Sequence, residues 1–166
     1  STGGHANGEA GVSTRTPSLI GTADTLGSAR DVILSADGNT AYVADYFSGF
    51  QIIDVSDSNA PTVIGTLATS GTAFGVTLSV DGNTAYVADG SSGLQIIDVS
   101  DSNAPTVIGT LATSGQAFDV TLSADGNTAY VADDIAGLQI IDVSNSSDPT
   151  LTSTLDTSGF AEDVTL

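Results

Sequence analysis

The chain repeats itself every 44 residues over most of its length, and this repeat limits the possible fold more than any other feature. Its most regular markers are Pro17, Pro61, Pro105 and Pro149, together with Tyr42, Tyr86 and Tyr130. Residues 51–89 and 95–133 differ at only three pairs of positions, which indicates recent duplication of one unit. A chain of this kind folds as a series of similar modules, each of which buries its apolar surface against its neighbours.

Each unit contains four short apolar segments separated by turn signals. In the second unit these segments, which we call strands A, B, C and D, are residues 73–79, 84–89, 94–99 and 106–111. The sequence Asp81-Gly82-Asn83 separates A from B, and Gly and Asn accept the positive φ values that tight turns require. Short strands with turn signals at about ten-residue spacing predict an all-β fold.

Several of the predicted strands are apolar on both faces, as in Tyr86-Val87-Ala88. A sheet with both faces covered fits a propeller blade that lies between two neighbouring blades. A solenoid is the alternative, although solenoid repeats are usually shorter or helical. We therefore predict a β-propeller built from four-stranded antiparallel blades.

The boundaries follow from the repeat. Residues 1–16, which include His5, are small and polar and are predicted to form a flexible linker. The rest is predicted as a lone D strand over 17–23, blades over about 29–67, 73–111 and 117–155, and a partial blade over 161–166. A propeller needs roughly four to eight blades to close. We therefore expect an incomplete ring, a natural protein that continues past Leu166, and association or poor folding of these residues alone.

Two segments of each unit suggest a family. In the second unit, Asp81–Asp89 reads Asp-Gly-Asn-Thr-Ala-Tyr-Val-Ala-Asp. Gly93–Ser100 reads Gly-Leu-Gln-Ile-Ile-Asp-Val-Ser, and Ala104-Pro105 follows. Over residues 17–166 the chain resembles the LVIVD and YVTN β-propeller repeats of bacterial surface proteins. This resemblance implies the fold and a place at the cell surface, but it says little about function, because propellers host many functions.

The charge balance excludes some classes of partner. The chain has 20 acidic residues, only Arg15 and Arg30 as basic residues, and a net charge of −18. Such a surface repels nucleic acid and anionic membranes, because both are bound through Lys and Arg. There is no Cys, and no apolar run of about 18 residues suggests membrane insertion. The start at Ser1 and the composition, rich in Thr, Ser, Asn, Gly and Asp, favour a processed protein that is extracellular or at the cell surface.

Sequence differences between the units concentrate in the predicted B–C and D–A loops. In antiparallel blades these loops share one face, whereas the A–B turns and C–D loops share the other. We predict that the variable face binds a protein or glycan ligand, or further copies of the same chain, with neutral drift of the loops as the alternative. The predicted binding residues on this face are Tyr46, Phe47, Gln116, Asp134, Ile135 and Phe160.

Carboxylates recur at fixed positions of the repeat. Asp31, Asp119 and Asp163 begin the predicted A strands near the central axis, and they form a candidate Ca²⁺ site because Ca²⁺ prefers oxygen ligands. A structural role is the alternative. We expect a structural role for the Asp residues at the ends of the B strands, with an Asp45–Arg30 pair as one option. We also expect one for Asp54 and its equivalents in the C strands.

Catalysis finds little support in the residue types present. A Cys-His arrangement is excluded because the chain has no Cys. A Ser-His-Asp arrangement would need the single histidine, which lies in the predicted linker. We therefore predict a non-catalytic interaction or adhesion module. One alternative is a structural subunit of a surface layer or extracellular filament that pairs through open sheet edges. Another is a metal-dependent hydrolase with key residues outside this segment, since YVTN-type propellers resemble some lactone hydrolases in fold.

Overall fold

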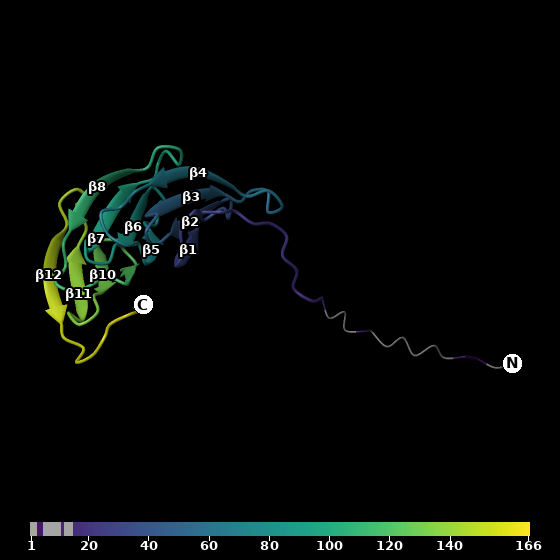
Figure 1. Ribbon diagram of the computed structural model, residues 1–166. Helices are drawn as coiled ribbons and strands as arrows, with labels where there is room; N and C mark the ends of the chain where they lie inside the picture. The colour runs from purple at the N-terminus through teal and green to yellow at the C-terminus, as the bar shows by residue number, and fades with distance from the viewer. Residues whose placement is uncertain (1–2, 5–10, 12–14) are drawn as a thin grey trace.

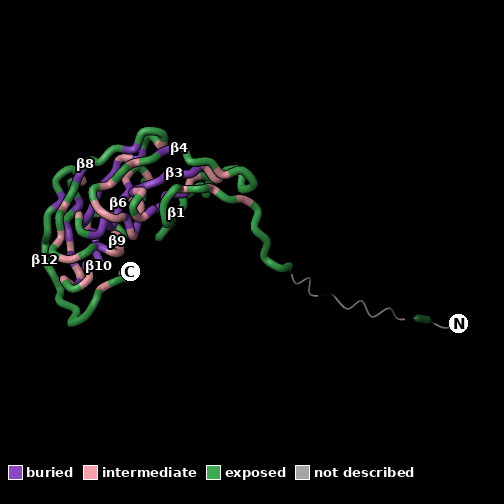
Figure 2. Tube along the Cα trace, viewed as in Figure 1, coloured by how far each residue is buried: buried purple, intermediate pink, exposed green. Residues whose placement is uncertain are grey.

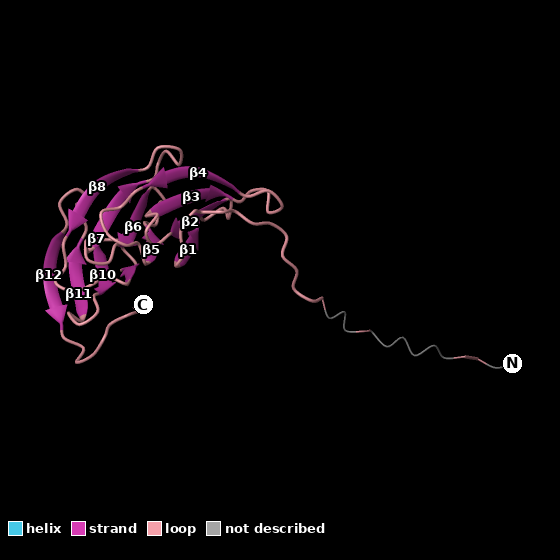
Figure 3. Ribbon diagram, viewed as in Figure 1, coloured by secondary structure: helices cyan, strands magenta, loops and turns pink. Residues whose placement is uncertain are grey.

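The computed structural model describes residues 3–4, 11 and 15–166, and over these residues the chain forms strands and loops without a helix (Figures 1 and 3). The first blade contains β1 (Asp31–Leu34), β2 (Thr40–Ala44), β3 (Phe50–Asp54) and β4 (Thr62–Leu67). The second contains β5 (Gly75–Leu78), β6 (Thr84–Ala88), β7 (Leu94–Asp98) and β8 (Thr106–Leu111). The third contains β9 (Asp119–Leu122), β10 (Thr128–Ala132), β11 (Leu138–Asp142) and β12 (Thr150–Leu155).

The strands within each blade pair in chain order, and every pair is antiparallel. The three blades follow one another in an arc, with β1, β5 and β9 toward its inner side and β4, β8 and β12 along its outer rim (Figures 1 and 2). The inner strands also touch each other, β1 with β5 and β5 with β9. The predicted four-stranded antiparallel blades are therefore confirmed, and the solenoid alternative is wrong.

The hydrophobic core lies between the blades. Phe50 and Ile52 of the first blade belong to one buried cluster with Val76, Val87 and Ile97 of the second. The equivalent residues 44 positions later build the same cluster between the second and third blades. Figure 2 shows this burial in the strands between neighbours, with exposed residues along the outer rim. Each face of a blade is therefore buried by the neighbouring blade that packs against it.

The turns and bulges also repeat from blade to blade. Gly38, Gly82 and Gly126 have φ of 73–74° in the A–B turns, as the turn sequence predicts. The pairing of the two outer strands shifts register in every blade, between Ile52 and Ile53 in the first. Such a bulge bends and twists the strand. The sequence pattern gives no sign of this bulge.

The two end segments differ from the prediction, because neither 17–23 nor 161–166 forms a strand. Gly21 nevertheless lies against the Ser58 carbonyl, as Gly65 lies against that of Ser102, so residues near 21 follow the path of a D strand. In the C-terminal segment, Ala161 makes only an isolated bridge. A strand needs a ladder partner, and none of the described strands lies beside these segments in the missing B and C positions. The predicted linker and His5 lie largely outside the described residues.

The described residues contain no helix of the length and apolar character that crossing a membrane requires.

Candidate functional site

The B–C turns and D–A loops lie on one face of the arc, which we call the loop face (residues 46–48, 90–92 and 134–136 with 28–30, 72–74, 116–118 and 160–162). Tyr46 and Ala73 exchange two backbone hydrogen bonds, with N–O distances of 3.0 and 3.1 Å. Gly90 with Ala117, and Asp134 with Ala161, repeat this bridge. Each B–C turn is therefore joined to the D–A loop of the next blade, so the face is continuous across the blade boundaries.

A row of four aromatic side chains crosses the loop face, and we call it the aromatic row. The ring of Tyr46 lies 4.0 Å from Phe47 and 5.4 Å from Phe74, and Phe74 lies 4.8 Å from Phe118, all between centroids. Phe47 is 79% exposed, whereas the other three rings are half-buried. The guanidinium of Arg30 lies over the Tyr46 ring, 4.3 Å from its centroid. Cation–π contacts of this kind hold both groups in place.

The row contains residues that the sequence-based prediction omits. Loop variation predicts Tyr46 and Phe47, but it predicts neither Phe74 and Phe118 of the row nor Arg30 beside it. The repeat itself could identify these residues, because successive members of the set are 44 positions apart: Arg30, Phe74, Phe118 and Glu162. These four side chains line one hollow at the inner end of the loop face, which we call the mouth. A comparison of the position before each A strand therefore reveals the site.

The other predicted binding residues lie on the same face but outside the aromatic row. Ile135 is 70% exposed and Phe160 is 72% exposed. Gln116 is also exposed, beside the Ala117 bridge. Asp134 is half-buried at the start of its B–C turn with φ of 54°, in the left-handed region. The loop face therefore carries exposed apolar side chains in the first and third B–C turns and in the last D–A loop.

The three Asp residues of the candidate Ca²⁺ site line one polar hollow but do not form a group that could hold a metal ion. Asp31 accepts the Val76 amide of the next blade at 2.9 Å, and Asp119 accepts the Val164 amide at 3.0 Å. Across the described residues, no group of three or more His, Cys, Asp or Glu side chains could hold a metal ion. The geometry of the described residues therefore gives no support for a Ca²⁺ site here, and the Ca²⁺ site stays a prediction. Asp31 instead connects β1 with β5, and Asp119 connects β9 with the C-terminal segment.

Asp119 and Asp163 form a close pair. Burial, followed by the hydrogen bond with Asp163, raises the pKa of Asp119 from 3.8 to about 6. The two carboxyls share a polar hollow with Glu162 on the concave side of the arc. A proton shared between two nearby acids relieves their repulsion, which accounts for the direction of this change.

The Asp residues at the ends of the B strands are fully buried and organise the D–A loops, as expected. Asp89 accepts the Thr69 hydroxyl at 2.6 Å and the Gly71 amide at 2.8 Å. Burial raises the pKa of Asp89 despite these two hydrogen bonds. Asp45 accepts the Thr25 hydroxyl at 2.7 Å, but its Oδ2 has no partner. The expected Asp45–Arg30 pair is replaced by these contacts and by the position of Arg30 over Tyr46.

The Asp residues at the ends of the C strands have the predicted turn-organising role. Asp54 accepts the hydroxyl of Ser56 at 2.6 Å and its amide at 2.9 Å, and these bonds lower the pKa of Asp54. Asp98 and Asp142 repeat the pattern. They are not buried in the sheet, which corrects their apparent position inside apolar strands. These groups belong to the scaffold.

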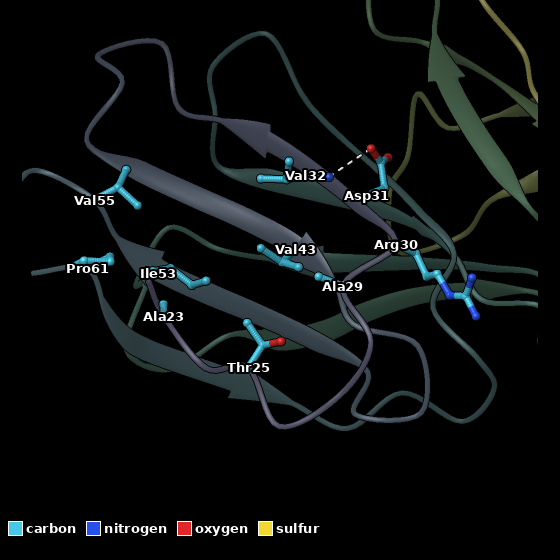
Figure 4. Close-up of a pocket in the computed structure, with 10 residues that line it drawn as sticks. All are labelled: Ala23, Thr25, Ala29, Arg30, Asp31, Val32, Val43, Ile53, Val55 and Pro61. Atoms are coloured by element: carbon cyan, nitrogen blue, oxygen red, sulfur yellow. Dashed lines mark hydrogen bonds between the residues drawn. The ribbon is translucent and has the colours of Figure 1, made fainter. Parts of the chain in front are cut away.

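An apolar hollow on the first blade has a different origin from the mouth (Figure 4). It is lined by Val32, Val43, Ile53 and Val55, among others. The same residue types occupy the equivalent positions of the second blade, where they pack against the first blade. Figure 4 shows the Arg30 side chain pointing away from these apolar groups. The hollow is therefore an uncovered blade face rather than a pocket shaped for a small molecule.

Solved structures with a similar fold have varied functions. Hydrazine synthase of Kuenenia stuttgartiensis has a TM-score of 0.67 at 19% identity, over 81% of this chain and 37% of that one. A candidate 6-phosphogluconolactonase of Bacteroides uniformis has a TM-score of 0.71 at 18% identity, over 81% and 43%. The Cps50 (Swd1) β-propeller domain of Myceliophteria thermophila has a TM-score of 0.64 at 15% identity, over 79% and 44%. These likenesses establish the fold alone, and the chain spans less than half of each structure.

A search of the curated proteins found no match. The LVIVD repeat, by contrast, matches residues 26–69, 71–113 and 114–157, which together cover most of the chain. Each matched segment begins in the loop before an A strand and ends just after the following D strand, so it contains one blade of the structure. With its three antiparallel blades and three repeat matches, the chain belongs to the LVIVD repeat family of β-propeller proteins.

Proposed function

We propose that this protein is a non-catalytic interaction module that binds another macromolecule through its loop face. The aromatic row carries the proposal, because it places Phe47, Tyr46, Phe74 and Phe118 side by side on the face where the units differ most. Aromatic side chains are enriched at protein interfaces, where they provide large contact areas with little loss of conformational freedom.

The opposite face has the properties of a scaffold. Its A–B turns have the same Asp-Gly-Asn sequence in all three blades. In the first, Asp37 accepts the Ser35 hydroxyl at 2.6 Å and the Asn39 amide at 3.0 Å. The polar groups of these turns are therefore largely engaged with one another, whereas the aromatic row lies on the loop face.

The residue composition supports a non-catalytic role. The sequence has no Cys, no Lys and one His, so it offers no thiolate or amine nucleophile and a single imidazole for proton transfer. The enzymes among the structural neighbours are similar in fold, which does not transfer their activities. The acidic composition supports a location outside the cell or at its surface. The resemblance of the repeats to those of bacterial surface proteins supports the same location.

The proposal is tested with a panel of defined synthetic peptides and oligosaccharides immobilised on a surface. A Phe47→Ser and Ile135→Ser double variant should lose most of the retention shown by the unmodified protein. Val80→Ser is the matched control, because Val80 is 84% exposed in an A–B turn on the opposite face. Circular dichroism verifies that all proteins are folded. Absence of retention on every probe, or equal loss in the control, contradicts the proposal.

A further inference from the structure

The mouth holds one cationic side chain of the chain itself. Arg30 lies over the ring of Tyr46 in the aromatic row. At the equivalent positions of the next two units, Phe74 and Phe118 line the same hollow. A guanidinium or ammonium group is attracted to the face of an aromatic ring. The contact with Arg30 shows the type of group that this row can accommodate.

Carboxylates surround the other end of the mouth. Glu162 follows Phe118 in the ring of equivalent positions, and Asp119 at the start of β9 and Asp163 in the C-terminal segment line the adjoining polar hollow. They are too dispersed for three of them to bind one metal ion. Several long basic side chains, in contrast, can each reach a separate carboxylate. The spacing therefore suits an extended basic segment better than a single small cation.

We propose that the partner of the loop face is a basic segment of another protein, with Arg or Lys side chains lying over Phe118 and pairing with Glu162 and Asp163. This inference depends on the interaction role proposed above and specifies the chemistry of the partner. The net charge of −18 supports it, because an acidic surface attracts basic partners over long range and accelerates their association.

The geometry of the row favours a basic peptide over a glycan. Phe74 meets Tyr46 at an interplanar angle of 73° and Phe118 at 67°, so the rings pack edge to face. Successive rings therefore do not form a flat platform for a row of sugar rings. A neutral glycan would also bring no positive charge to balance the neighbouring carboxylates. A flexible Arg or Lys side chain can use one ring and one carboxylate together.

The probes are oligo-arginine, oligo-lysine, oligo-glutamate and uncharged Gly-Ser peptides of equal length, with binding measured by fluorescence anisotropy at low and physiological salt. Oligo-arginine should bind most tightly, because guanidinium groups stack on aromatic rings as well as pair with carboxylates. A Glu162→Gln and Asp163→Asn double variant should weaken binding by about tenfold, equivalent to roughly 1.4 kcal/mol. Phe118→Leu should weaken oligo-arginine binding more than oligo-lysine binding.

The charge-matched control is a double variant with Asp57→Asn and Asp101→Asn. Asn already stands at the equivalent position in the third unit, Asn145, where its side chain accepts the Ser147 amide. This control should leave oligo-arginine binding nearly unchanged. Equal weakening by both double variants, or no binding of oligo-arginine, overturns the basic-partner proposal. Retention of an oligosaccharide or uncharged peptide that depends on Phe47 would overturn it too, while leaving the interaction role in place.

Discussion

The second and third blades have almost the same sequence but differ in burial. Ile96 and Ile97 of the second blade are both fully buried, because a neighbouring blade covers each face. In the third blade Ile141 is fully buried, but Ile140, on the opposite face, is only half-buried. The first blade shows the mirror case, since Val32 is 58% exposed whereas its equivalent Val76 is 4% exposed. Burial in this fold is therefore set by the neighbouring blade and not by the strand's own residues.

The largest expected effect tests this comparison directly. Ile96→Ala should lower the free energy of unfolding by roughly 2–5 kcal/mol, the usual cost of truncating a fully buried Ile. Ile140→Ala, the same change in the same strand position of the third blade, should cost clearly less. Chemical denaturation of both variants measures the difference. Equal losses would show that the third blade is covered on both faces in solution.

The buried Asp residues offer a second contrast. Asp89→Asn replaces one of two accepting oxygens by a donor, so the Gly71 amide or Thr69 hydroxyl loses its partner, at a cost of about 1–3 kcal/mol. Asp45→Asn should cost less, because Oδ2 of Asp45 has no partner to lose. Thermal unfolding of the two variants checks the order. A larger loss at Asp45 would mean that its second oxygen is engaged in solution.

The Asp119–Asp163 pair predicts a dependence of stability on pH. The pKa of Asp119 is raised to about 6 in the folded protein, above the ordinary value of 3.8, so the folded state binds this proton more tightly. The contribution of Asp119 to the free energy of unfolding is therefore fully present below about pH 4 and is lost as the pH rises through about 6. Asp119→Asn should flatten the stability profile in this window. Asp31→Asn is the control, because Gly75 replaces the second carboxyl there, and an unchanged profile in Asp119→Asn would contradict the prediction.

The smallest expected effect concerns the first residue of the B–C turn. Tyr46, Gly90 and Asp134 all have φ of 54°, a conformation that favours glycine. Asp134→Gly should therefore stabilise the fold by up to about 1 kcal/mol. Tyr46→Gly should gain less or lose stability, because it also removes the contacts with Arg30 and Phe74. Denaturant titration of the pair measures whether the aromatic contacts outweigh the strain.

Much of the architecture could be predicted because it depends on local pattern. The strands of each blade follow from apolar segments between turn signals, and the role of Asp54 follows from its place before a polar loop. The strands expected over 17–23 and 161–166 could not be confirmed, since a strand requires a partner and not only β-forming residues. The bulge beside Ile52 and Ile53 was also missed, because it arises from the twist between paired strands.

The sequence by itself determined the repeat, the blade and the separation of an invariant face from a variable one, because these depend on spacing along the chain. Only the tertiary structure decided which side chains of different units meet. The rotation from blade to blade brings Arg30, Phe74, Phe118 and Glu162 into one hollow. The same rotation brings Asp31, Asp119 and Asp163 to one polar hollow, where they do not form a group that could hold a metal ion. Equal spacing in sequence places residues on a ring, but the distance between them depends on the number of blades that separate them.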